Sequence, residues 1–326
     1  MSNPLQLTLA VAHYDRHIPL LDGSVQPEGI HLTVLEVGQA VRGKHGADRH
    51  GRMLKHGEFD FAEVSLSSYL VARDRGRPVL AIPVFPRRLF SMSNMYVYLP
   101  AGIRSPADLV GRRVGLNSYQ TSLSVLAKGD LAHEYGVPWK QISWVTAREE
   151  TIPFEAPAEV RLERSPPGGD LGRLLAEGEL AALFVPHPPR VVLDRDPRVG
   201  PLFPDAQAEE TRYFQKNGYY PIMHVVCVRA DVLEGDPWTA RAIFEAFEQA
   251  RAASLRYYED PNWSRFAWGR QYVEEERRLL GMDPWRNGLV ANRVNLDRFI
   301  RYEHEQGLIS HDLAVDALFA ESTLDT

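Results

Sequence analysis

Strand-like and helix-like segments alternate along most of this chain, and that alternation constrains its fold more than any other feature. Short apolar runs recur, and turn-rich or helical sequence separates them. Such a pattern is typical of an α/β protein in which helices cover largely parallel sheets. The runs that we predict to be strands are residues 6–11, 30–35, 59–64, 79–84, 95–99, 113–116, 180–185 and 222–229.

Two lobes are predicted from a second set of helix and strand signals that begins near residue 100. Ser105 at an N-cap, Pro106 at the first helical position and Asp108 at the third form a compact helix-start signal. The run 102–115 looks like the beginning of the second lobe of a two-lobed solute-binding protein. A ligand cleft is then expected between the lobes, beside a two-strand hinge. The lobes are predicted as residues 1–98 with 222–326, and residues 99–221.

The composition narrows the class of protein and its partners. With 326 residues the chain is long enough for about two domains. A net charge of -6 gives no electrostatic reason to expect nucleic acid or an anionic membrane as a partner. No apolar run approaches the roughly 18 residues of a membrane span. The start of the chain lacks the pattern of an export signal, so we expect a cytoplasmic protein.

Cysteine and histidine give little support for a metal site. Cys227 is the single cysteine, which excludes an intrachain disulfide, and its apolar surroundings favour strand packing over nucleophilic use. Six of the 11 histidines crowd the start of the chain, without a His-x-His pair or a His-Glu-x-x-His pattern. We therefore expect no metal, with a metal-dependent decarboxylase or hydrolase as an alternative. These histidines are His13, His17, His31, His45, His50 and His56.

Nucleotide and serine-hydrolase motifs are incomplete or missing. Residues 38–44 match the beginning of a phosphate-binding P-loop, but His45 follows where a Ser or Thr would hold magnesium. Neither a Gly-x-Ser-x-Gly nor a Gly-x-Gly-x-x-Gly pattern occurs. A nucleotide cofactor and a serine nucleophile are therefore not expected.

Several longer motifs occur in order along nearly the whole chain. They are Ala12-His-Tyr-Asp-Arg16, Leu54-Lys-His-Gly-Glu-Phe-Asp60, Glu63-Val-Ser-Leu-Ser-Ser-Tyr69, Ile82-Pro-Val-Phe-Pro86, Pro221-Ile-Met-His224 and Tyr302-Glu-His-Glu-Gln-Gly307. With them the chain resembles the 4,5-dihydroxyphthalate decarboxylase family. The resemblance implies a type II periplasmic-binding-protein-like fold and the non-oxidative, cofactor-free loss of one carboxylate from a catechol-like ring. The chain departs from the family at the polar segment 41–50 and at Met92, where a histidine is expected nearby.

Candidate site residues follow predicted strands, because ligands of open α/β sheets bind beyond the carboxyl ends of the strands. Residues 118–121 also begin a helix, whose backbone N–H groups favour an anion such as a substrate carboxylate. The side chains expected at these strand ends are Tyr14, Asp15, Arg16, Glu63, Ser65, Ser67, Ser118, Tyr119, Gln120, Thr121 and His187.

Loss of a ring carboxylate requires an acid near the ring carbon and a cation on the retained carboxylate. His224 is the first choice for the acid, because it begins the returning strand and histidine titrates near neutral pH. His187 is the second choice. Arg88 is the preferred carboxylate clamp, since a guanidinium forms two parallel hydrogen bonds with a carboxylate. Asp15 or Glu63 is expected to polarise a ring hydroxyl or to orient the histidine.

Other readings of these residues, and of the whole protein, stay open at this point. Arg16 is as well placed for an ion pair with Asp15 as for the substrate, and Arg87 reads as a solvated surface charge. Tyr14 and Tyr119 could stack on an aromatic ring. A non-exported binding protein or sensor for an aromatic carboxylic acid is the alternative to the enzyme. In either case the expected partner is a small aromatic acid, and a homo-oligomer is one outcome that the sequence does not decide.

Overall fold

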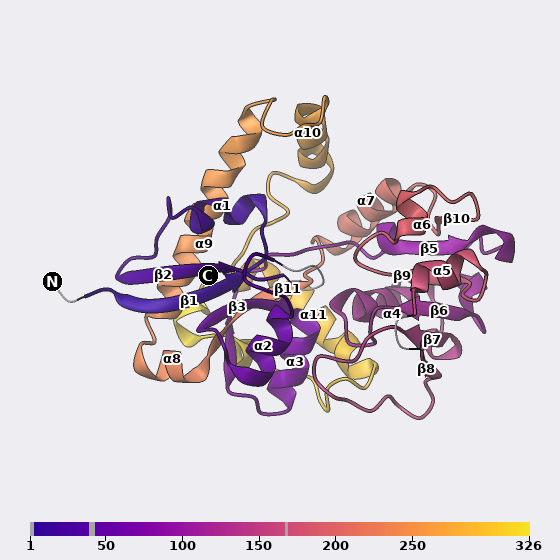
Figure 1. Cartoon of the computed structure of the whole chain (residues 1–326), viewed down its shortest axis with the longest axis horizontal. Coiled ribbons are helices and arrows are strands. Elements are labelled where there is room, and N and C mark those ends of the chain that lie inside the picture. Colours follow the sequence, from indigo (N-terminus) through magenta and orange to yellow (C-terminus); the bar gives the residue numbers. More distant parts are fainter. Residues whose placement is uncertain (1–2, 39–42, 167–168) are drawn as a thin grey trace. The chain divides into compact units, whose positions relative to one another are not determined.

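The structure is a computed structural model that describes residues 3–38, 43–166 and 169–326, and the chain divides into two compact units (Figure 1). Each unit has its own sheet. The first unit consists of Met1–Arg88, His224–Asp297 and Leu313–Thr326, and the second of Leu89–Met223 and Arg298–Asp312.

The sheet of the first unit has the strand order β2-β1-β3-β11-β4. β1 pairs in parallel with β2 and with β3, whereas β11 pairs antiparallel with β3 and with β4. The carboxyl ends of β1 and β3 therefore lie at the same edge as the beginning of β11. The strands are β1 (Leu5–Val11), β2 (Ile30–Glu36), β3 (Phe61–Ser65), β4 (Val79–Ile82) and β11 (His224–Arg229).

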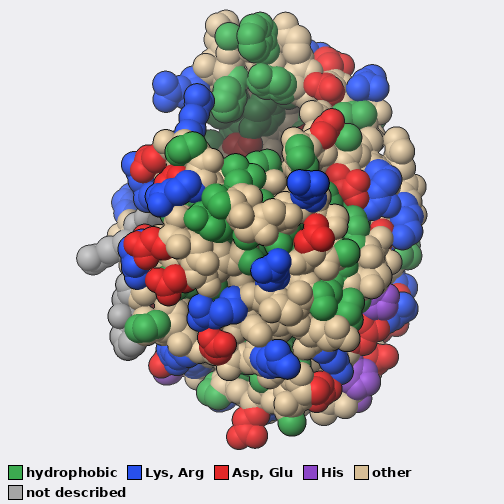
Figure 2. Space-filling model, turned by 90° about the vertical axis from the view of Figure 1, so that its right-hand side faces the viewer, with side chains coloured by type: hydrophobic (Ala, Val, Ile, Leu, Met, Phe, Trp, Pro, Cys, Tyr) green, Lys and Arg blue, Asp and Glu red, His purple; other side chains and the backbone are tan. Residues whose placement is uncertain are grey.

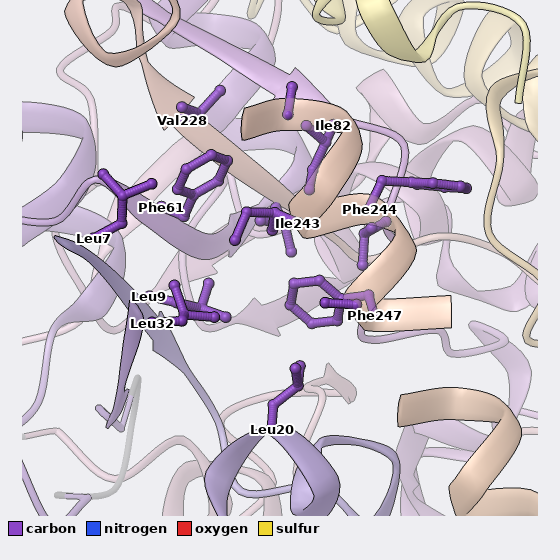
Figure 3. Packing of buried hydrophobic residues seen from close by; sticks show 14 of the residues in the cluster. Leu7, Leu9, Leu20, Leu32, Phe61, Ile82, Val228, Ile243, Phe244 and Phe247 are labelled. Carbon is purple, nitrogen blue, oxygen red and sulfur yellow. The ribbon is translucent and has the colours of Figure 1, made fainter. Parts of the chain in front are cut away.

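Helices cover both faces of this first sheet. α1 and α9 pack on one face and form its core, and Figure 1 shows α2 and α3 on the side opposite to α1. Figure 3 shows the core, in which Ile243 and Phe247 of α9 meet Leu9 of β1. Burial of each such side chain contributes about 1.5–3 kcal/mol. The helices are α1 (Ile18–Leu21), α2 (Arg49–His56), α3 (Leu66–Asp74), α8 (Ala230–Gly235), α9 (Thr239–Leu255), α10 (Gly269–Leu280) and the first part of α11 (Leu289–Glu305).

The sheet of the second unit has the strand order β10-β5-β9-β6-β7-β8. β6 pairs in parallel with β7 and β9, and β7 pairs in parallel with β8. β5 pairs antiparallel with β9 and with β10. The strands are β5 (Met95–Tyr98), β6 (Arg113–Leu116), β7 (Ser143–Thr146), β8 (Leu162–Arg164), β9 (Ala182–Phe184) and β10 (Val199–Pro201).

The longest helix of the second unit packs closely against the end of α11. A Cβ at Gly129 in α4 would lie 2.0 Å from Cδ2 of Tyr302, so only glycine permits this approach. α4 ends at Gly136, whose φ of 65° is left-handed and therefore suits glycine. The helices of this unit are α4 (Ser122–Tyr135), α5 (Leu171–Ala176), α6 (Arg190–Leu193), α7 (Ala206–Asn217) and the last part of α11.

The unit boundaries differ from the predicted lobe boundaries in two places. β5 was predicted in lobe 1, but it pairs with β9 and β10 and lies in the second unit. Residues 298–312 were also predicted in lobe 1 and belong to the second unit as well. Both differences arise because the partners of these segments are distant in sequence. β7, β8 and β10 are short strands where no strand is predicted.

The surface carries charged side chains of both signs. Figure 2 shows one face of the molecule, on which Lys and Arg side chains are interspersed with Asp and Glu. Within the residues that the structure describes, no helix combines the length and the apolar character that a membrane crossing needs.

Candidate functional site

A buried group of ionisable side chains lies at the carboxyl edge of the first sheet. His224, the first residue of β11, is paired with Ser65, the last residue of β3. Tyr14 follows β1, and α2 begins with Arg49 and His50. Three strands and one helix therefore bring their ends to the edge where open α/β sheets bind ligands.

Glu63 of β3 is the centre of this group and is fully buried. Its Oε1 atom lies 2.5 Å from Nδ1 of His224. Its Oε2 atom accepts a hydrogen bond from the backbone N–H of Ala12 at 2.9 Å. The hydroxyl of Tyr14 donates to Oε1 at 3.3 Å. The carboxylate of β3 is thus held by groups from β11 and from the residues that follow β1.

Arg49 supplies the positive charge that balances this carboxylate. Its Nη2 atom lies 3.1 Å from Oε1 of Glu63, and its Nε atom donates to the backbone carbonyl of Glu63 at 2.6 Å. Nη1 donates to the carbonyl of Val37. Burial alone raises the pKa of Glu63, but Arg49 and the hydrogen bond from His224 outweigh burial and hold that pKa well below its usual value. Glu63 is therefore ionised.

The ionised Glu63 determines which nitrogen of His224 carries a proton. A carboxylate can only accept, so Nδ1 of His224 is the donor and Nε2 carries the lone pair when the ring is neutral. Burial lowers the pKa of His224 to about 4, even though the hydrogen bond to Glu63 favours the charged form. Arg87 and Arg49 lower this pKa further. His224 is therefore neutral near pH 7 in the ligand-free protein.

His50 is a second buried imidazole in this group, and no site role is predicted for it from the sequence. Its ring centroid lies 5.0 Å from that of His224, with the ring planes at 87°. Nε2 of His50 is buried and has no hydrogen-bond partner among the described residues. Burial, His224 and Arg49 hold the pKa of His50 well below its ordinary value. The only sequence signal is its place directly after Arg49 in the first turn of α2.

Tyr14 and His17 border the group but differ in character. Burial and the nearby Glu63 charge raise the pKa of Tyr14 to about 12, so its hydroxyl stays a donor. His17 donates from Nδ1 to the carbonyl of Ala12 at 2.9 Å and packs on the ring of Phe247. Burial lowers the pKa of His17 to about 4. His17 is thus a hydrogen-bonded core histidine.

Asp15 and Arg16 form the ion pair that was one of the two alternatives for them. Nη1 of Arg16 lies 3.2 Å from Oδ1 of Asp15, and Nε of Arg16 donates to the carbonyl of Pro86 at 2.9 Å. The Arg16 guanidinium lies 4.2 Å from the ring centroids of both Tyr14 and Trp285. Oδ2 of Asp15 accepts from Tyr258. Asp15, Arg16, Tyr258 and Trp285 line a cavity of about 330 Å³ in the first unit.

Arg88, the predicted carboxylate clamp, is occupied by the protein itself. It is 2 % exposed, and its Nη2 atom donates to the carbonyl of Arg286 at 2.8 Å and to Oδ1 of Asn292 at 2.7 Å. The half-buried Arg87 instead influences the Glu63 group, because its charge lowers the pKa of Tyr14, His50 and His224.

The predicted anion site at residues 118–121 holds a carboxylate of the chain itself. The backbone N–H groups of Tyr119 and Gln120 donate to Glu150 at 2.7 and 2.9 Å. Ser118 Oγ and Thr121 Oγ1 are hydrogen-bonded at 2.9 Å. The two backbone donors that we expected to meet a substrate carboxylate are therefore satisfied internally.

The side chains of Tyr119 and Gln120 also have partners within the second unit. The Tyr119 ring stacks on Phe154 with centroids 5.1 Å apart, and its hydroxyl donates to the carbonyl of Gln306 at 3.2 Å. The Gln120 amide exchanges two hydrogen bonds with the backbone of Ile152, at 3.0 and 3.1 Å. Both side chains thus hold the second unit together.

The remaining candidates fall in different places. Ser65 ends β3 beside His224, and Ser67 is buried in the first turn of α3. His187 is exposed on the second unit, after β9. Cys227 is buried in β11, and burial raises its pKa. The P-loop-like run 38–44 and the polar segment 41–50 lie partly outside the described residues.

A metal site is not apparent at this edge. Across residues 3–38, 43–166 and 169–326, no three His, Cys, Asp or Glu side chains are grouped so that they could hold a metal ion. What the site offers is a neutral imidazole fixed by a carboxylate, a second imidazole beside it and two nearby guanidinium groups. Such a set can move protons and hold an anion.

Comparisons with known proteins identify similar sequences and a similar fold. A family model described as NMT1/THI5 like matches residues 35–155. A 4,5-dihydroxyphthalate decarboxylase of Comamonas testosteroni is 34% identical over 334 residues, which cover 99% of this chain and 98% of the relative. A 4,5-dihydroxyphthalate decarboxylase of Pseudomonas putida is 33% identical over 225 residues, which cover 67% of this chain and 84% of the relative.

Among solved structures, the periplasmic aliphatic sulphonate binding protein SsuA of Escherichia coli has a TM-score of 0.57. It is 12% identical, and the match covers 98% of this chain and 99% of that protein. The fold is therefore the α/β periplasmic-binding-protein-like fold that the sequence motifs predicted.

Proposed function

The chain belongs to the 4,5-dihydroxyphthalate decarboxylase family, and from that premise we propose that it removes one carboxylate, as carbon dioxide, from a hydroxylated phthalate-like acid. The family relatives are named for this activity. The single observation that carries the proposal to a mechanism is the buried hydrogen bond between Glu63 and His224. This pair provides a proton-transfer group whose orientation is fixed.

The reaction needs a proton at a ring carbon. When the bond between the ring and the carboxylate breaks, its electron pair stays on the ring carbon, and a proton must form the new C–H bond. A hydroxyl para to that carbon assists by donating electron density into the ring. Each carboxylate of 4,5-dihydroxyphthalate has such a para hydroxyl. This chemistry requires no organic cofactor, and we propose that none is used.

His224 is the proposed proton donor, through Nε2. Its pKa of about 4 makes it neutral in the free protein, but the two negative charges of a phthalate favour the imidazolium once the substrate is bound. Glu63 accepts from Nδ1 and so stabilises the imidazolium and fixes the ring. Proton transfer from Nε2 then forms the C–H bond as carbon dioxide departs. The same division between a histidine and an orienting carboxylate operates in hydrolase triads.

Arg87 is the proposed partner of the carboxylate that the substrate retains. Its charge acts on His224, His50 and Tyr14, so it lies near the reacting groups. Arg49 has a different role, because its guanidinium balances the buried Glu63 carboxylate and donates to two backbone carbonyls. Tyr14 and Ser65 are proposed to contact the substrate from the ends of β1 and β3.

The direct test is to incubate the purified protein with 4,5-dihydroxyphthalate, with and without a chelator. We expect release of carbon dioxide and formation of 3,4-dihydroxybenzoate in equal amounts, at the same rate in both samples. If neither 4,5-dihydroxyphthalate nor related hydroxylated benzoates release carbon dioxide, the proposed function is wrong. A loss of activity only in the chelated sample would instead indicate a metal-dependent decarboxylase.

A binding protein for an aromatic acid is the second candidate, and the shared fold with a sulphonate-binding protein favours it. The two candidates differ in how the protein responds to loss of His224. In a binding protein, His224→Gln changes affinity alone. In the enzyme, turnover falls much further than binding does.

A further inference from the structure

We propose that His50 is a second catalytic imidazole, which accepts the proton of the ring hydroxyl para to the departing carboxylate while His224 protonates the ring carbon. This inference rests on the proposed decarboxylation and adds a base to its acid. The site would then move two protons in one reaction, one off oxygen and one onto carbon.

The first support is the unpaired nitrogen of His50. The side chain is buried at the beginning of α2, yet its Nε2 atom has no hydrogen-bond partner among the described residues. A buried polar atom without a partner is destabilising, so such atoms in native proteins call for an explanation. Every hydrogen-bonding group of Glu63 at the centre of the cluster, in contrast, has a partner within the protein. A ligand hydroxyl would supply the partner that His50 lacks.

The second support is the division of charge between the two histidines. The groups that act on His50 are His224 of β11, Arg49 of α2, Glu63 of β3 and Arg87 after β4. Two imidazoles with centroids 5.0 Å apart disfavour double protonation, so at most one of the two rings is an imidazolium near neutral pH. Glu63 is hydrogen-bonded to His224, which directs that proton to His224. His50 is left as the neutral base.

The third support is how these two roles fit one aromatic ring. In a para-hydroxybenzoate unit, the hydroxyl oxygen and the reacting carbon lie at opposite ends of the ring, a span that two neighbouring imidazoles can cover. The edge-on arrangement of the two rings, at 87°, lets their nitrogens point in different directions. Where the surroundings separate the pKa values of two titratable groups, one group serves as the acid and the other as the base.

The proton and electron balance is as follows. The O–H bond of the para hydroxyl breaks and its proton moves to Nε2 of His50 in the same step in which His224 gives up its proton, so the two imidazoles are not charged together and electron density moves into the ring. The ring carbon takes a proton from Nε2 of His224, the C–C bond breaks, and carbon dioxide leaves while the ring recovers its aromatic electrons. His50 returns its proton to the oxygen. One proton is consumed overall, and solvent replaces it on His224.

The kinetic test compares His50→Gln with His56→Gln, a matched change at the exposed end of the same helix. General-base catalysis of this kind typically contributes about 10²–10⁴-fold. We expect kcat of His50→Gln to fall by at least about 10²-fold, and that of His56→Gln to stay near wild type. A ring-halogenated substrate, whose hydroxyl is already ionised at the assay pH, does not need the base. The loss in His50→Gln should then shrink to less than about tenfold.

A binding test separates this inference from the proposed function. Calorimetry compares 3,4-dihydroxybenzoate with benzoate, for wild type and for His50→Leu. A hydrogen bond from the hydroxyl to His50 should make wild type prefer the hydroxylated ligand by about tenfold, and His50→Leu should lose that preference. If wild type shows the preference but no turnover, the reaction is wrong and the hydroxyl contact stands.

The inference is overturned if kcat of His50→Gln stays within about threefold of wild type, a difference below 1 kcal/mol. It is also overturned if His50→Gln loses equal activity on ordinary and halogenated substrates, because a purely structural role predicts that result. His50→Gln can be used in calorimetry as well if His50→Leu does not fold.

Discussion

Each of the two sheets ends in loops that hold a carboxylate, but the partners of the two carboxylates differ. At the edge of the first sheet, Glu63 binds Arg49 and His224, and a second imidazole lies beside them with an unpaired nitrogen. At residues 118–121 of the second sheet, the backbone donors already hold Glu150. Both places look like ligand sites in the sequence. The comparison teaches that a strand end or a helix start marks a site only where the protein leaves a polar group for the ligand.

The two edges also differ in what burial does to their ionisable groups. Arg49 and His224 overcome burial at Glu63, which keeps its charge. Burial raises the pKa of Glu150, since its neighbours are mainly backbone amides and a hydroxyl. The first edge thus keeps a charged carboxylate beside two imidazoles, whereas the second uses a carboxylate to connect two loops.

The largest effect is expected at His224. Replacing it by Gln removes the proposed proton donor while keeping a similar size and a polar side chain. Because general acid catalysis typically contributes about 10²–10⁴-fold, kcat should fall by about 10³-fold with little change in KM. Steady-state kinetics with 4,5-dihydroxyphthalate measures this. His187→Gln, on the exposed loop after β9, is the control. If both variants lose the same activity, the edge of the first sheet has no special part in the reaction.

The next largest effect is on stability, at Glu63. Glu63→Gln leaves the Arg49 guanidinium buried without its carboxylate, and breaking a buried ion pair by removing one partner typically costs about 3–5 kcal/mol. Urea unfolding at pH 7 measures the free energy change. The same substitution at Glu150 keeps an acceptor for the two backbone amides and should cost far less. If the two variants lower the free energy of unfolding equally, the buried ion pair at the first edge does not stabilise the protein more than the hydrogen bonds of Glu150 do.

Acid should destabilise the first unit through its buried histidines. The pKa values of His17 and His224 are about 4 in the folded protein, below the ordinary 6.5, so between these values the unfolded chain binds protons that the folded chain does not. Their contribution to stability is complete above pH 6.5 and is lost as the pH falls toward 4. At pH 5, which lies about 1.5 pH units below 6.5, each histidine should lower the free energy of unfolding by about 2 kcal/mol, since one pKa unit corresponds to about 1.4 kcal/mol.

Urea unfolding at pH 7.5 and pH 5 measures this loss. His224→Gln should reduce the difference between the two pH values, whereas His187→Gln, which changes an exposed residue, should leave it unchanged. Equal unfolding free energies at the two pH values would show that these histidines are not held neutral by burial.

A smaller effect is expected when the Glu150 carboxylate is removed from the second edge. Glu150→Ala removes the acceptor of the Tyr119 and Gln120 amides and should cost about 1–3 kcal/mol. Added sulfate should then raise the melting temperature of Glu150→Ala more than that of wild type, because the two amides become available to an anion. If Glu150→Ala also lowers kcat as strongly as His224→Gln, the second edge takes part in the reaction after all.

The smallest effect is expected at Ser118, whose hydroxyl is hydrogen-bonded to Thr121 and to Glu150. Ser118→Ala should cost about 0.5–1.5 kcal/mol of stability and change KM by less than about twofold. A tenfold rise in KM would show instead that residues 118–121 bind the substrate carboxylate.

Much of the fold could be predicted from the sequence because its signals are local. The strand runs at β1, β2, β3 and β11 are short and apolar, and the Ser105 and Asp108 signal forms the capping box that it predicts. The placement of β5 could not be predicted in this way. Its apolar run fits either sheet, and only pairing with β9, more than 80 residues later, decides between them.

The site was predicted in part, for similar reasons. Glu63 and His224 follow from strand ends, and the register of β3 and β11 brings them together. Which of two adjacent arginines acts on the charges of the site depends on how the segment after β4 packs, which the sequence does not reveal. His50 was missed because a buried nitrogen without a hydrogen-bond partner singles it out from the other histidines, and this depends on the long-range packing of α2.

The most direct test of the Glu63 and His224 pair is the protonation state of His224, measured by nitrogen NMR on protein with ¹⁵N-labelled histidine and assigned with His224→Gln. At pH 7 the free protein should show a neutral His224 with its proton on Nδ1, and an imidazolium should appear when a phthalate-type dianion binds. A neutral ring with its proton on Nε2, or a ring whose charge does not respond to the dianion, would contradict the account.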